Sequence, residues 1–458
     1  MVGPILSLVI IILVGWLLVK KYNPQATLLI AGLLLLIIAQ LLGNDLPVLT
    51  KPTGSNVFDL FAGIKESFSK TNAGVGLMIM AIGGFVAYMD KIGASNVLVL
   101  YTMKPLSIFK KFPYVAASLV IPIGQILFVA IPSAAGLGLL LMASLYPILI
   151  RLGVSKVSAV SVITASTVFG IGPACATTAS AIEILRMDTV LYFLRYQIPL
   201  VWPLTLTLMV LYYFVNKHYD KKLLVNIDER LSTQSPPPPA PGIYGLLPVL
   251  PIALLIIFSE FFTWMEKPIQ LDTTTVIFIS FFIALIFEGI RRRAFKPVAN
   301  AFSIFWDGMA NIFKSVVTLI IAADIFAKGL ISIGFIDGLL ALTTQFGMGA
   351  IGLGIVMTLM IFLASMLMGS GNAAFFAFGP LVPGLAAKVG LSGAAMLLPM
   401  QLAASMGRAI SPVSGVLIAT AEIAGLTSMD IVKRNIIPLS VTLIVMLTLH
   451  FLYNDKAH

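Results

Sequence analysis

The sequence contains little charge and almost no cysteine. Charged residues make up 10% of its 458 residues and hydrophobic residues 59%, whereas an ordinary soluble domain carries about 25% charge. The single cysteine, Cys175, excludes an intramolecular disulfide. The net charge of +10 does not indicate a nucleic-acid-binding protein, because the basic residues stand in short stretches beside apolar runs.

The residues that most enzymes need are also scarce. No Gly-Lys dipeptide occurs, so there is no P-loop and no sign of ATP-driven work. The histidines His218, His450 and His458 are expected in loops or at the tail, away from any buried acid–base or metal site. Only Asp324 is well placed for an aspartyl mechanism, which needs two buried aspartates. We therefore expect a protein that is not an enzyme and needs no cofactor.

Long apolar runs recur along the whole chain instead. Because a membrane-spanning helix needs about 20 apolar residues, the runs predict an all-α protein with about ten transmembrane helices. The first run is expected to be a retained helix, since no basic residue precedes it. The predicted spans are about 4–20, 26–43, 74–90, 157–184, 190–215, 243–262, 274–290, 315–335, 393–424 and 435–453.

The basic residues predict the orientation of these spans. Four groups flank the runs, and cytoplasmic anchoring places all four inside. They are Lys104, Lys110, Lys111, Arg151 and Lys156; Lys217, Lys221, Lys222 and Arg230; Arg291, Arg292, Arg293 and Lys296; and Lys433 with Arg434. The acidic 260–273 loop is expected outside. The assignments agree if both termini are outside and if 113–150 and 350–387 are re-entrant hairpins.

Motifs near the middle of the chain recur near its end. Three residue pairs keep one common separation: Ser133 with Ser370, Gly153 with Gly390, and Gly170 with Gly407. The matching loops 104–111 and 341–352 are expected on opposite faces, so the repeats are predicted to be inverted. The predicted domains are a first repeat at 1–215, a cytoplasmic Pro-rich linker at 216–241 that acts as a stiff spacer, and a second repeat at 242–458.

Similar segments also precede one span in each half. They read F-D-L-F-A-G at 58–63 and F-S-I-F-W-D-G at 302–308. Their apolar residues stand at helical spacing, which favours amphipathic helices lying at the membrane interface. An ordinary polar loop is the alternative.

Glycine and proline break the predicted helices 157–184 and 393–424, at Gly170–Pro173 and Gly407–Gly415. Unpaired backbone groups are costly in hydrocarbon, so such breaks must line a cavity or be buried in protein. Paired breaks in the two halves of a membrane chain are typical of a transporter site. Helix N-termini at the breaks and at the hairpin tips offer free N–H groups and a positive dipole end, which suit a carboxylate.

Polar side chains at these points are the candidate substrate ligands. Asn372, in G-S-G-N, is preferred as a ligand over a residue that only closes its own turn. Ser133 and Ser370 either bind substrate or cap helices. The other candidates are Gly371, Thr177, Thr178, Arg408, Ser411, Pro412 and Ser414. The threonines could instead bond their own backbone, and Arg408 could hold a carboxylate or extend to the cytoplasmic surface.

Three acids are candidates for coupling to a sodium ion or a proton. Glu183 and Glu422 occupy equivalent positions in the two repeats, and the alternative places both at the water boundary. Asp324 could simply pair with Lys328 four residues later.

These motifs resemble the DcuC family of anaerobic four-carbon dicarboxylate carriers. The similarity is most specific at G-S-G-N-A-A-F-F-A-F (369–378) and G-R-A-I-S-P-V-S-G-V (407–416). The resemblance implies a homodimeric carrier of succinate, fumarate and malate in the bacterial inner membrane, with a scaffold domain and an elevator-like transport domain. By similarity, Ser370, Gly371, Asn372, Ser411 and Ser414 face the substrate. The first break departs from the family pattern, reading P-A-C-A-T at 173–177.

Other functions stay open at this point. A carrier of a tricarboxylate or an acidic amino acid is the alternative within secondary transport, and competition between acids separates the two. A channel is a different class, which saturable uptake and counterflow would exclude.

Overall fold

The computed structural model describes residues 2–109, 111–221, 240–260, 269, 271–293 and 295–454. This part of the chain is helical and contains no strand, in agreement with the predicted all-α class. Nine of its helices are long and apolar enough to cross a membrane. Residues 222–239 of the predicted linker, and 261–268 of the acidic loop, lie outside the described residues.

Each predicted span contains a helical segment. The helices of the first half are α1 (Val2–Val19), α2 (Pro24–Leu41), α3 (Asn56–Thr71), α4 (Leu77–Lys91), α5 (Ala94–Met103), α6 (Pro113–Ala130), α7 (Ala134–Ser144), α8 (Tyr146–Arg151), α9 (Lys156–Ala165), α10 (Ala176–Leu185), α11 (Thr189–Leu191) and α12 (Ile198–Asp220). Those of the second half are α13 (Leu250–Ile257), α14 (Thr273–Arg292), α15 (Phe295–Ile312), α16 (Thr318–Ser332), α17 (Phe335–Gln345), α18 (Ala350–Met368), α19 (Gly371–Phe378), α20 (Val382–Val389), α21 (Gly393–Arg408), α22 (Gly415–Ile423) and α23 (Ser428–Asn454).

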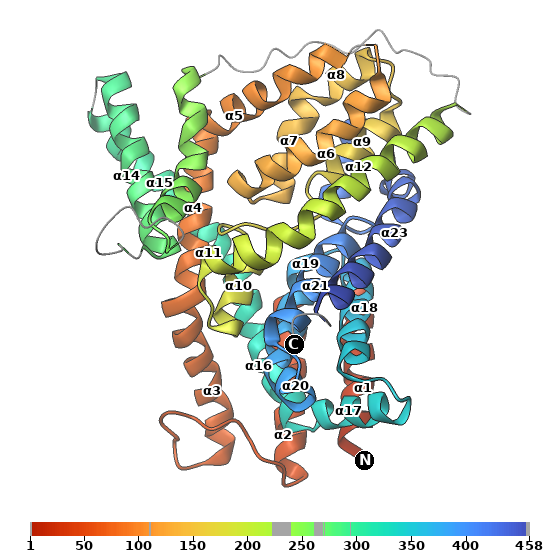
Figure 1. Cartoon of the computed structure of the whole chain (residues 1–458). Helices are drawn as coiled ribbons and strands as arrows, with labels where there is room; N and C mark the ends of the chain where they lie inside the picture. Colours follow the sequence, from red (N-terminus) through yellow and green to blue (C-terminus); the bar gives the residue numbers. More distant parts are fainter. Residues whose placement is uncertain are drawn as a thin grey trace.

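Short π and 3-10 segments connect several of these helices. The π segments are η1 (Asn72–Gly76), η3 (Tyr192–Gln197) and η5 (Phe313–Val317), and the 3-10 segments are η2 (Lys104–Phe109), η4 (Gly242–Val249) and η6 (Gly379–Leu381). Helices α5 and α8 lie at one end of the molecule, and α17 and the N-terminus lie at the other (Figure 1).

The recurring motifs R-L-G-V-S and K-V-G-L-S mark where one helix ends and the next begins. Gly153 and Gly390 adopt left-handed backbone conformations, with φ of +87° and +72°, which glycine adopts without strain. Two residues later, the Ser155 hydroxyl accepts a hydrogen bond from the Ser158 N–H, and Ser392 does the same for the first turn of α21. The motif is therefore a stop signal followed by a start signal.

The segments 58–63 and 302–308 lie in the helices α3 and α15, as predicted, and their place at a membrane interface stays a prediction. The π segment η1 joins α3 to α4 with a kink at Gly74, whereas α15 continues through η5 into α16 as one helical stretch from Val298 to Ser332. In α3, Phe58 and Phe61 are exposed, while Leu60 packs in a buried cluster with Leu36 and Ile325. One face of α3 therefore contacts α2 and α16, and the other points outward.

Arg434 is not a loop residue, contrary to its use in the charge-based orientation. Helix α23 begins at Ser428, before the expected start, and Arg434 lies inside it and is buried. Its Nη1 atom lies 3.0 Å from the Asp220 carboxylate. Asp220 also accepts hydrogen bonds from the Ser155 and Ser158 hydroxyls. This polar cluster joins the ends of α9, α12 and α23.

The histidine prediction was also wrong for His450. This residue lies in α23, is buried, and places Nε2 2.6 Å from the Ala395 carbonyl oxygen in α21. His218 likewise lies in a helix, near the end of α12, and His458 is outside the described residues. The described residues contain no cluster of three or more His, Cys, Asp or Glu side chains able to hold a metal ion.

Two close helix crossings depend on glycine. A Cβ atom on Gly32 in α2 would lie 2.7 Å from the backbone of Ile325 in α16, and one on Gly329 would lie 2.8 Å from the Gly32 oxygen. A Cβ on Gly308 in α15 would meet the backbone of Gly83 and Gly84 in α4 at 2.8 Å. The backbones touch at both crossings, as small residues allow between membrane helices.

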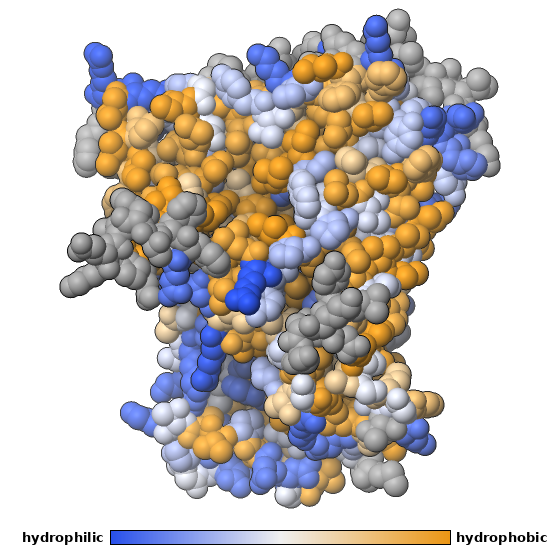
Figure 2. Space-filling view, viewed as in Figure 1, coloured by the Kyte–Doolittle hydropathy of each residue, from blue (hydrophilic) through white to orange (hydrophobic). Residues whose placement is uncertain are grey.

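The outer surface fits a lipid environment. Figure 2 shows apolar residues over most of the middle and upper part of the visible face, with hydrophilic residues gathered toward the lower end and along the upper rim. Large side chains such as Ile12, Trp16, Trp202 and Phe214 are more than half exposed. An apolar surface of this extent marks contact with a membrane.

Candidate functional site

Two helix interruptions form the centre of the site. The first separates α9 from α10 over residues 166–175, and the second separates α21 from α22 over residues 409–414. They contain Gly170–Pro173 and most of Gly407–Gly415, where the sequence predicted them.

Hydrogen bonds connect the two breaks directly. Arg408 Nη2 donates to the Thr167 carbonyl oxygen at 2.8 Å, and Gln401 Nε2 donates to the Gly170 carbonyl oxygen at 2.8 Å. Both donors belong to α21 and both acceptors to the first break. Side chains of the second half therefore satisfy buried carbonyl groups that the first break leaves without helical partners.

The tip of the second hairpin contacts the second break. Gly369 ends α18 with φ of +69°, and a Cβ atom there would lie 2.9 Å from the carbonyl group of Val413. A Cβ on Gly371 would lie 2.8 Å from the Ala404 carbonyl oxygen of α21. The hairpin tip can take this position because it carries glycine at both contacts.

Two hydroxyl groups beside this contact have no hydrogen-bond partner in the part of the chain that the structure describes. The Ser411 and Ser414 side chains are completely buried, and neither Oγ atom makes a hydrogen bond to the described residues. Ser414 directly precedes α22 but does not cap it, so the first N–H groups of α22 lack a side-chain acceptor. A buried polar group without a partner costs free energy, and an anion at this helix N-terminus would satisfy both kinds of donor.

Asn372 lies at the same hairpin tip. Its side chain is partly exposed and makes no hydrogen bond within the described part of the chain. It therefore does not close its own turn, which was the alternative to binding. Pro412, between the two serines, accepts a hydrogen bond on its carbonyl oxygen from the Ser428 hydroxyl.

Ser133 and Ser370 are both helix caps. Ser133 Oγ accepts from the Gly136 N–H at 3.1 Å, and Ser370 Oγ accepts from the Ala373 N–H at 3.2 Å. Each hydroxyl still has a hydrogen to donate. The helix after Ser133, α7, packs along α22, which places the first hairpin beside the second break.

Thr177 and Thr178 belong to a buried amide cluster that the sequence did not reveal. Gln401 Nε2 lies 3.2 Å from Thr177 Oγ1 and 3.0 Å from Thr178 Oγ1. Gln197 Nε2 donates to Thr178 Oγ1 at 2.9 Å, and the Tyr192 hydroxyl donates to Gln401 Oε1 at 2.9 Å. The threonines thus bond across the chain rather than to their own helix.

The amides of this cluster left only a weak signal in the sequence. Gln401 is a polar residue inside an apolar helix, and it stands as far before Gly407 as Thr164 stands before Gly170. Cys175 is buried, with Sγ 3.3 Å from Thr177 Oγ1, as expected for a small packing residue.

The candidate coupling acids do not meet at the breaks. Glu183 and Glu422 are both exposed, and Glu183 lies beside Gly74, where α3 and η1 bend toward α4. Asp324 pairs with Lys328 at 2.7 Å, which confirms the expected i, i+4 contact, and also accepts a hydrogen bond from Ser67 in α3 at 2.6 Å.

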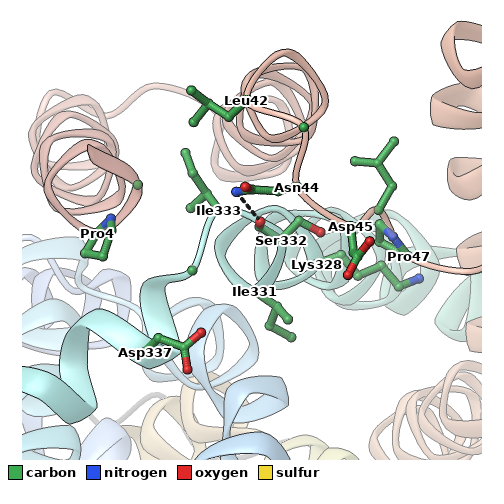
Figure 3. Close-up of a pocket in the computed structure, with 14 residues that line it drawn as sticks. Pro4, Leu42, Asn44, Asp45, Pro47, Lys328, Ile331, Ser332, Ile333 and Asp337 are labelled. Carbon is green, nitrogen blue, oxygen red and sulfur yellow. Dashed lines mark hydrogen bonds between the residues drawn. The ribbon is translucent and has the colours of Figure 1, made fainter. Parts of the chain in front are cut away.

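A cavity of about 980 Å³ lies at the end of the molecule that carries α17 and the N-terminus. Its walls come from the start of α1, the segment after α2, the end of α16 and the start of α17. Figure 3 shows the Asn44 amide bonded to the Ser332 carbonyl oxygen, with Asp45, Lys328 and Asp337 around the cavity. None of the candidate substrate ligands lines it, so it is separate from the breaks.

The fold and the paired breaks define a multi-pass helical membrane protein of the transporter class. The chain belongs to the DcuC family, described as C4-dicarboxylate anaerobic carriers, whose model matches residues 2–453. This confirms the resemblance drawn from its motifs. Because the family consists of transporters, the expectation that the chain is not an enzyme is also confirmed.

Named relatives cover almost the whole chain. A probable anaerobic C4-dicarboxylate transporter DcuC from Vibrio cholerae is 36% identical over 442 residues, which are 96% of this chain and 95% of the relative. An anaerobic C4-dicarboxylate transporter DcuC from Escherichia coli is 32% identical over 444 residues, covering 97% and 95%.

Two solved structures share the fold. The YdaH transporter of Alcanivorax borkumensis superimposes with a TM-score of 0.61 at 13% identity, covering 95% of this chain and 99% of that one. MtrF of Neisseria gonorrhoeae, described among antimetabolite efflux pumps, gives a TM-score of 0.63 at 13% identity, covering 94% of each chain. At this level of identity the likeness concerns the fold alone.

Proposed function

We propose that this protein is a secondary active carrier of small dicarboxylates, namely succinate, fumarate and malate, in the bacterial inner membrane. The family match and the names of the relatives support the substrate class. One structural observation carries the proposal. Two buried hydroxyls with no partner among the described residues stand at an uncapped helix N-terminus, beside a hairpin tip whose asparagine also makes no hydrogen bond to that part of the chain. These are neutral donors arranged for a carboxylate.

In this proposal one carboxylate binds at the second break. Ser411 and Ser414 donate their hydroxyl hydrogens, the first turn of α22 supplies N–H groups, and Asn372 donates from the hairpin tip. Arg408 lies at the end of α21, and one of its guanidinium nitrogens donates to the Thr167 carbonyl oxygen. Its fixed positive charge offsets part of the dianion's charge in a medium where an unpaired charge is costly.

The other candidates contribute from the first half. Ser133 and Ser370 keep their capping bonds and donate their remaining hydrogens to the substrate. Thr177 and Thr178 hold the backbone of the first break in place through the amide cluster. We assign the second carboxylate to the side of the site that faces the first hairpin, whose helix α7 runs along α22.

We further propose that the two halves are inverted repeats and that a transport domain moves by an elevator-like mechanism. Helix α19 of the second hairpin packs against α16, whereas its counterpart α7 packs on α5, α9 and α22. This difference between the contacts of the two hairpins supports a transport domain that stands at one end of its movement, as alternating access requires. The homodimer implied by the family would hold the scaffold helices still.

The experiment that tests the function is uptake of labelled succinate into proteoliposomes, with sodium and pH gradients imposed separately. Saturable uptake with counterflow supports a carrier, and linear flux without exchange contradicts it. Competition by fumarate and malate, but not by a tricarboxylate or an acidic amino acid, supports the substrate class. Dependence on one gradient identifies the coupling ion, and Glu183→Gln, Glu422→Gln and Asp324→Asn test the candidate coupling acids.

A further inference from the structure

We propose that Gln401 is a positioning residue whose side-chain amide takes the place of a bound cation at the first helix break. The inference deepens the proposed function, because it concerns how the same site is held and whether an ion is needed there. It rests on a contact pattern that neither the motifs nor the family assignment supplies.

Three oxygen atoms converge on one nitrogen. Gln401 Nε2 lies 2.8 Å from the Gly170 carbonyl oxygen, 3.0 Å from Thr178 Oγ1 and 3.2 Å from Thr177 Oγ1. All three residues that surround it are buried, and Gln401 itself has no exposed surface. A carbonyl and two hydroxyl oxygens around one centre are the ligands that a hard cation takes in a protein. Here an N–H₂ group occupies that centre.

The orientation of the amide follows from atoms that can play only one role. The Gly172 N–H can only donate, and it donates to Gln197 Oε1 at 3.0 Å. Gln197 therefore presents its Nε2 to Gln401, 3.3 Å from Gln401 Oε1. The Gly170 carbonyl can only accept, so it faces Gln401 Nε2. The Gly172 N–H and the Gly170 carbonyl oxygen therefore both require Gln401 Nε2 to point toward the three oxygen atoms.

The same chemistry occurs at the second break. Asn435 Nδ2 donates to the Ala409 carbonyl oxygen at 2.9 Å and to Thr164 Oγ1 at 3.2 Å. Its Oδ1 accepts from the Tyr212 hydroxyl at 2.9 Å, as Gln401 Oε1 accepts from Tyr192. Each break is thus held by an amide that a tyrosine orients. The first break differs in having a third oxygen around the nitrogen, which completes the cage.

A neutral amide supplies the positive ends of two N–H dipoles to these oxygens without placing a full charge in the membrane. The first break therefore keeps its shape with no ion bound. A carboxylate at the same position would remove both N–H donors and place a full negative charge against the Gly170 carbonyl oxygen, which can only accept. The two threonine hydroxyls could turn and donate to it, but a cation bound among these oxygens would offset the buried charge.

Gln401→Glu is the test, with Gln125→Glu as the matched control. Gln125 is also buried and also donates to the first broken helix, but only to the Ala165 carbonyl oxygen at 3.2 Å. Succinate uptake is measured in sodium chloride and in choline chloride. For Gln401→Glu we expect about a tenfold loss in choline and recovery along a saturable sodium curve. Wild type and Gln125→Glu should lack this added sodium dependence.

Thermal unfolding of the purified variants without substrate tests the role of Gln401 independently of the proposed function. Sodium should raise the melting temperature of Gln401→Glu by about 4 °C relative to choline, even if succinate is not the substrate. Gln401→Ser, which opens the cage without burying a charge, should show the same sign if the glutamate variant does not fold. Equal melting temperatures in both salts for both variants, or an equal sodium effect in Gln125→Glu, would overturn the proposal.

Discussion

At the scale of single residues, the most informative side chains are buried polar groups that have no hydrogen-bond partner among the described residues. Most buried polar atoms in native proteins have a partner, but Ser411 and Ser414 have none among the described residues. A ligand that supplies the missing acceptor would recover the free energy that each unpaired hydroxyl costs. Stability and binding should therefore respond to their removal in different ways.

Ser411→Ala and Ser414→Ala are expected to weaken transport without weakening the fold. In the proposed site each hydroxyl bonds to the substrate and to none of the described residues, so the KM for succinate should rise about tenfold while the melting temperature stays level. Ser365→Ala is the control, because the Ser365 hydroxyl donates to the Ala404 carbonyl oxygen and its loss should cost about 1 kcal/mol of stability. A fall in melting temperature for the first two variants, with KM unchanged, would contradict the assignment.

Asn372→Ala should abolish dicarboxylate uptake while the protein remains folded in the membrane. The side chain makes no hydrogen bond to the described residues that could be lost, so circular dichroism and the melting temperature should match wild type. Asn44→Ala serves as control, since its amide bonds the Ser332 carbonyl oxygen in the separate cavity and should leave uptake intact. Unchanged kinetics for Asn372→Ala would remove this residue from the site.

At the scale of helices, one buried ion pair and two glycine crossings hold the elements together. Asp220 and Arg434 are almost completely buried, and Tyr219 lies with its ring 5.0 Å from the Arg434 guanidinium. The serines of α9 bond to the same carboxylate. The broken helix α9 is therefore fixed to α12 and α23 at the end opposite its break.

Asp220→Asn should lower the free energy of unfolding by about 3 kcal/mol, because it leaves the Arg434 charge buried and unpaired. The paired replacement Asp220→Leu with Arg434→Met should recover much of this loss, as apolar replacements of buried ion pairs do. Arg195→Met, at the exposed equivalent in the first half, should have little effect. Thermal unfolding in detergent measures all three, and equal losses for the single and paired changes would argue against this role.

Gly32→Ala should destabilise the crossing of α2 and α16. The added Cβ would lie 2.7 Å from backbone atoms of Ile325, and backbone cannot move aside as a flexible side chain can, so we expect a cost of about 1–3 kcal/mol. Gly15→Ala in α1 is the matched control, since a Cβ there meets nothing within 4 Å. A melting temperature for Gly32→Ala equal to that of Gly15→Ala would show that the helices separate without cost.

At the scale of the whole molecule, orientation in the membrane is the property still to be measured. Helices α5 and α17 lie at opposite ends of the protein (Figure 1), and the segments 104–111 and 341–352, which include the connections to α6 and α18, should face opposite sides of the bilayer. Reporter fusions placed in each loop test this directly. Reporters active on one and the same side would refute the inverted repeats and, with them, the two-sided site.

Much of this architecture was predictable because its signals are local. Apolar runs locate the helices, and glycine and proline mark the breaks within a few residues. The capping motifs at 151–155 and 388–392 determine by themselves where one helix ends and the next begins. Asn372 and the serines of the second break were found by the same reasoning, although their binding role remains a prediction.

The missed features depend on partners that lie far away in the sequence. Gln197 and Gln401 bond to each other across half the chain, so neither residue stands out by itself. Arg434 was counted as a surface cation because positive-inside reasoning cannot detect its partner, Asp220. The apolar stripes at 58–63 and 302–308 predicted the helices α3 and α15, but not the π segments that join them to α4 and α16.

The helical stretch from Val298 to Ser332 has a consequence for the lipid around the protein. Its 35 residues extend for about 52 Å at 1.5 Å per residue, while the hydrocarbon layer is about 30 Å thick. A helix of this length must tilt strongly or extend into the headgroup region, and its tilt changes with the thickness of the membrane. The carrier should therefore sense acyl-chain length, and its turnover in short-chain and long-chain vesicles should differ even when the substrate and the gradients are the same.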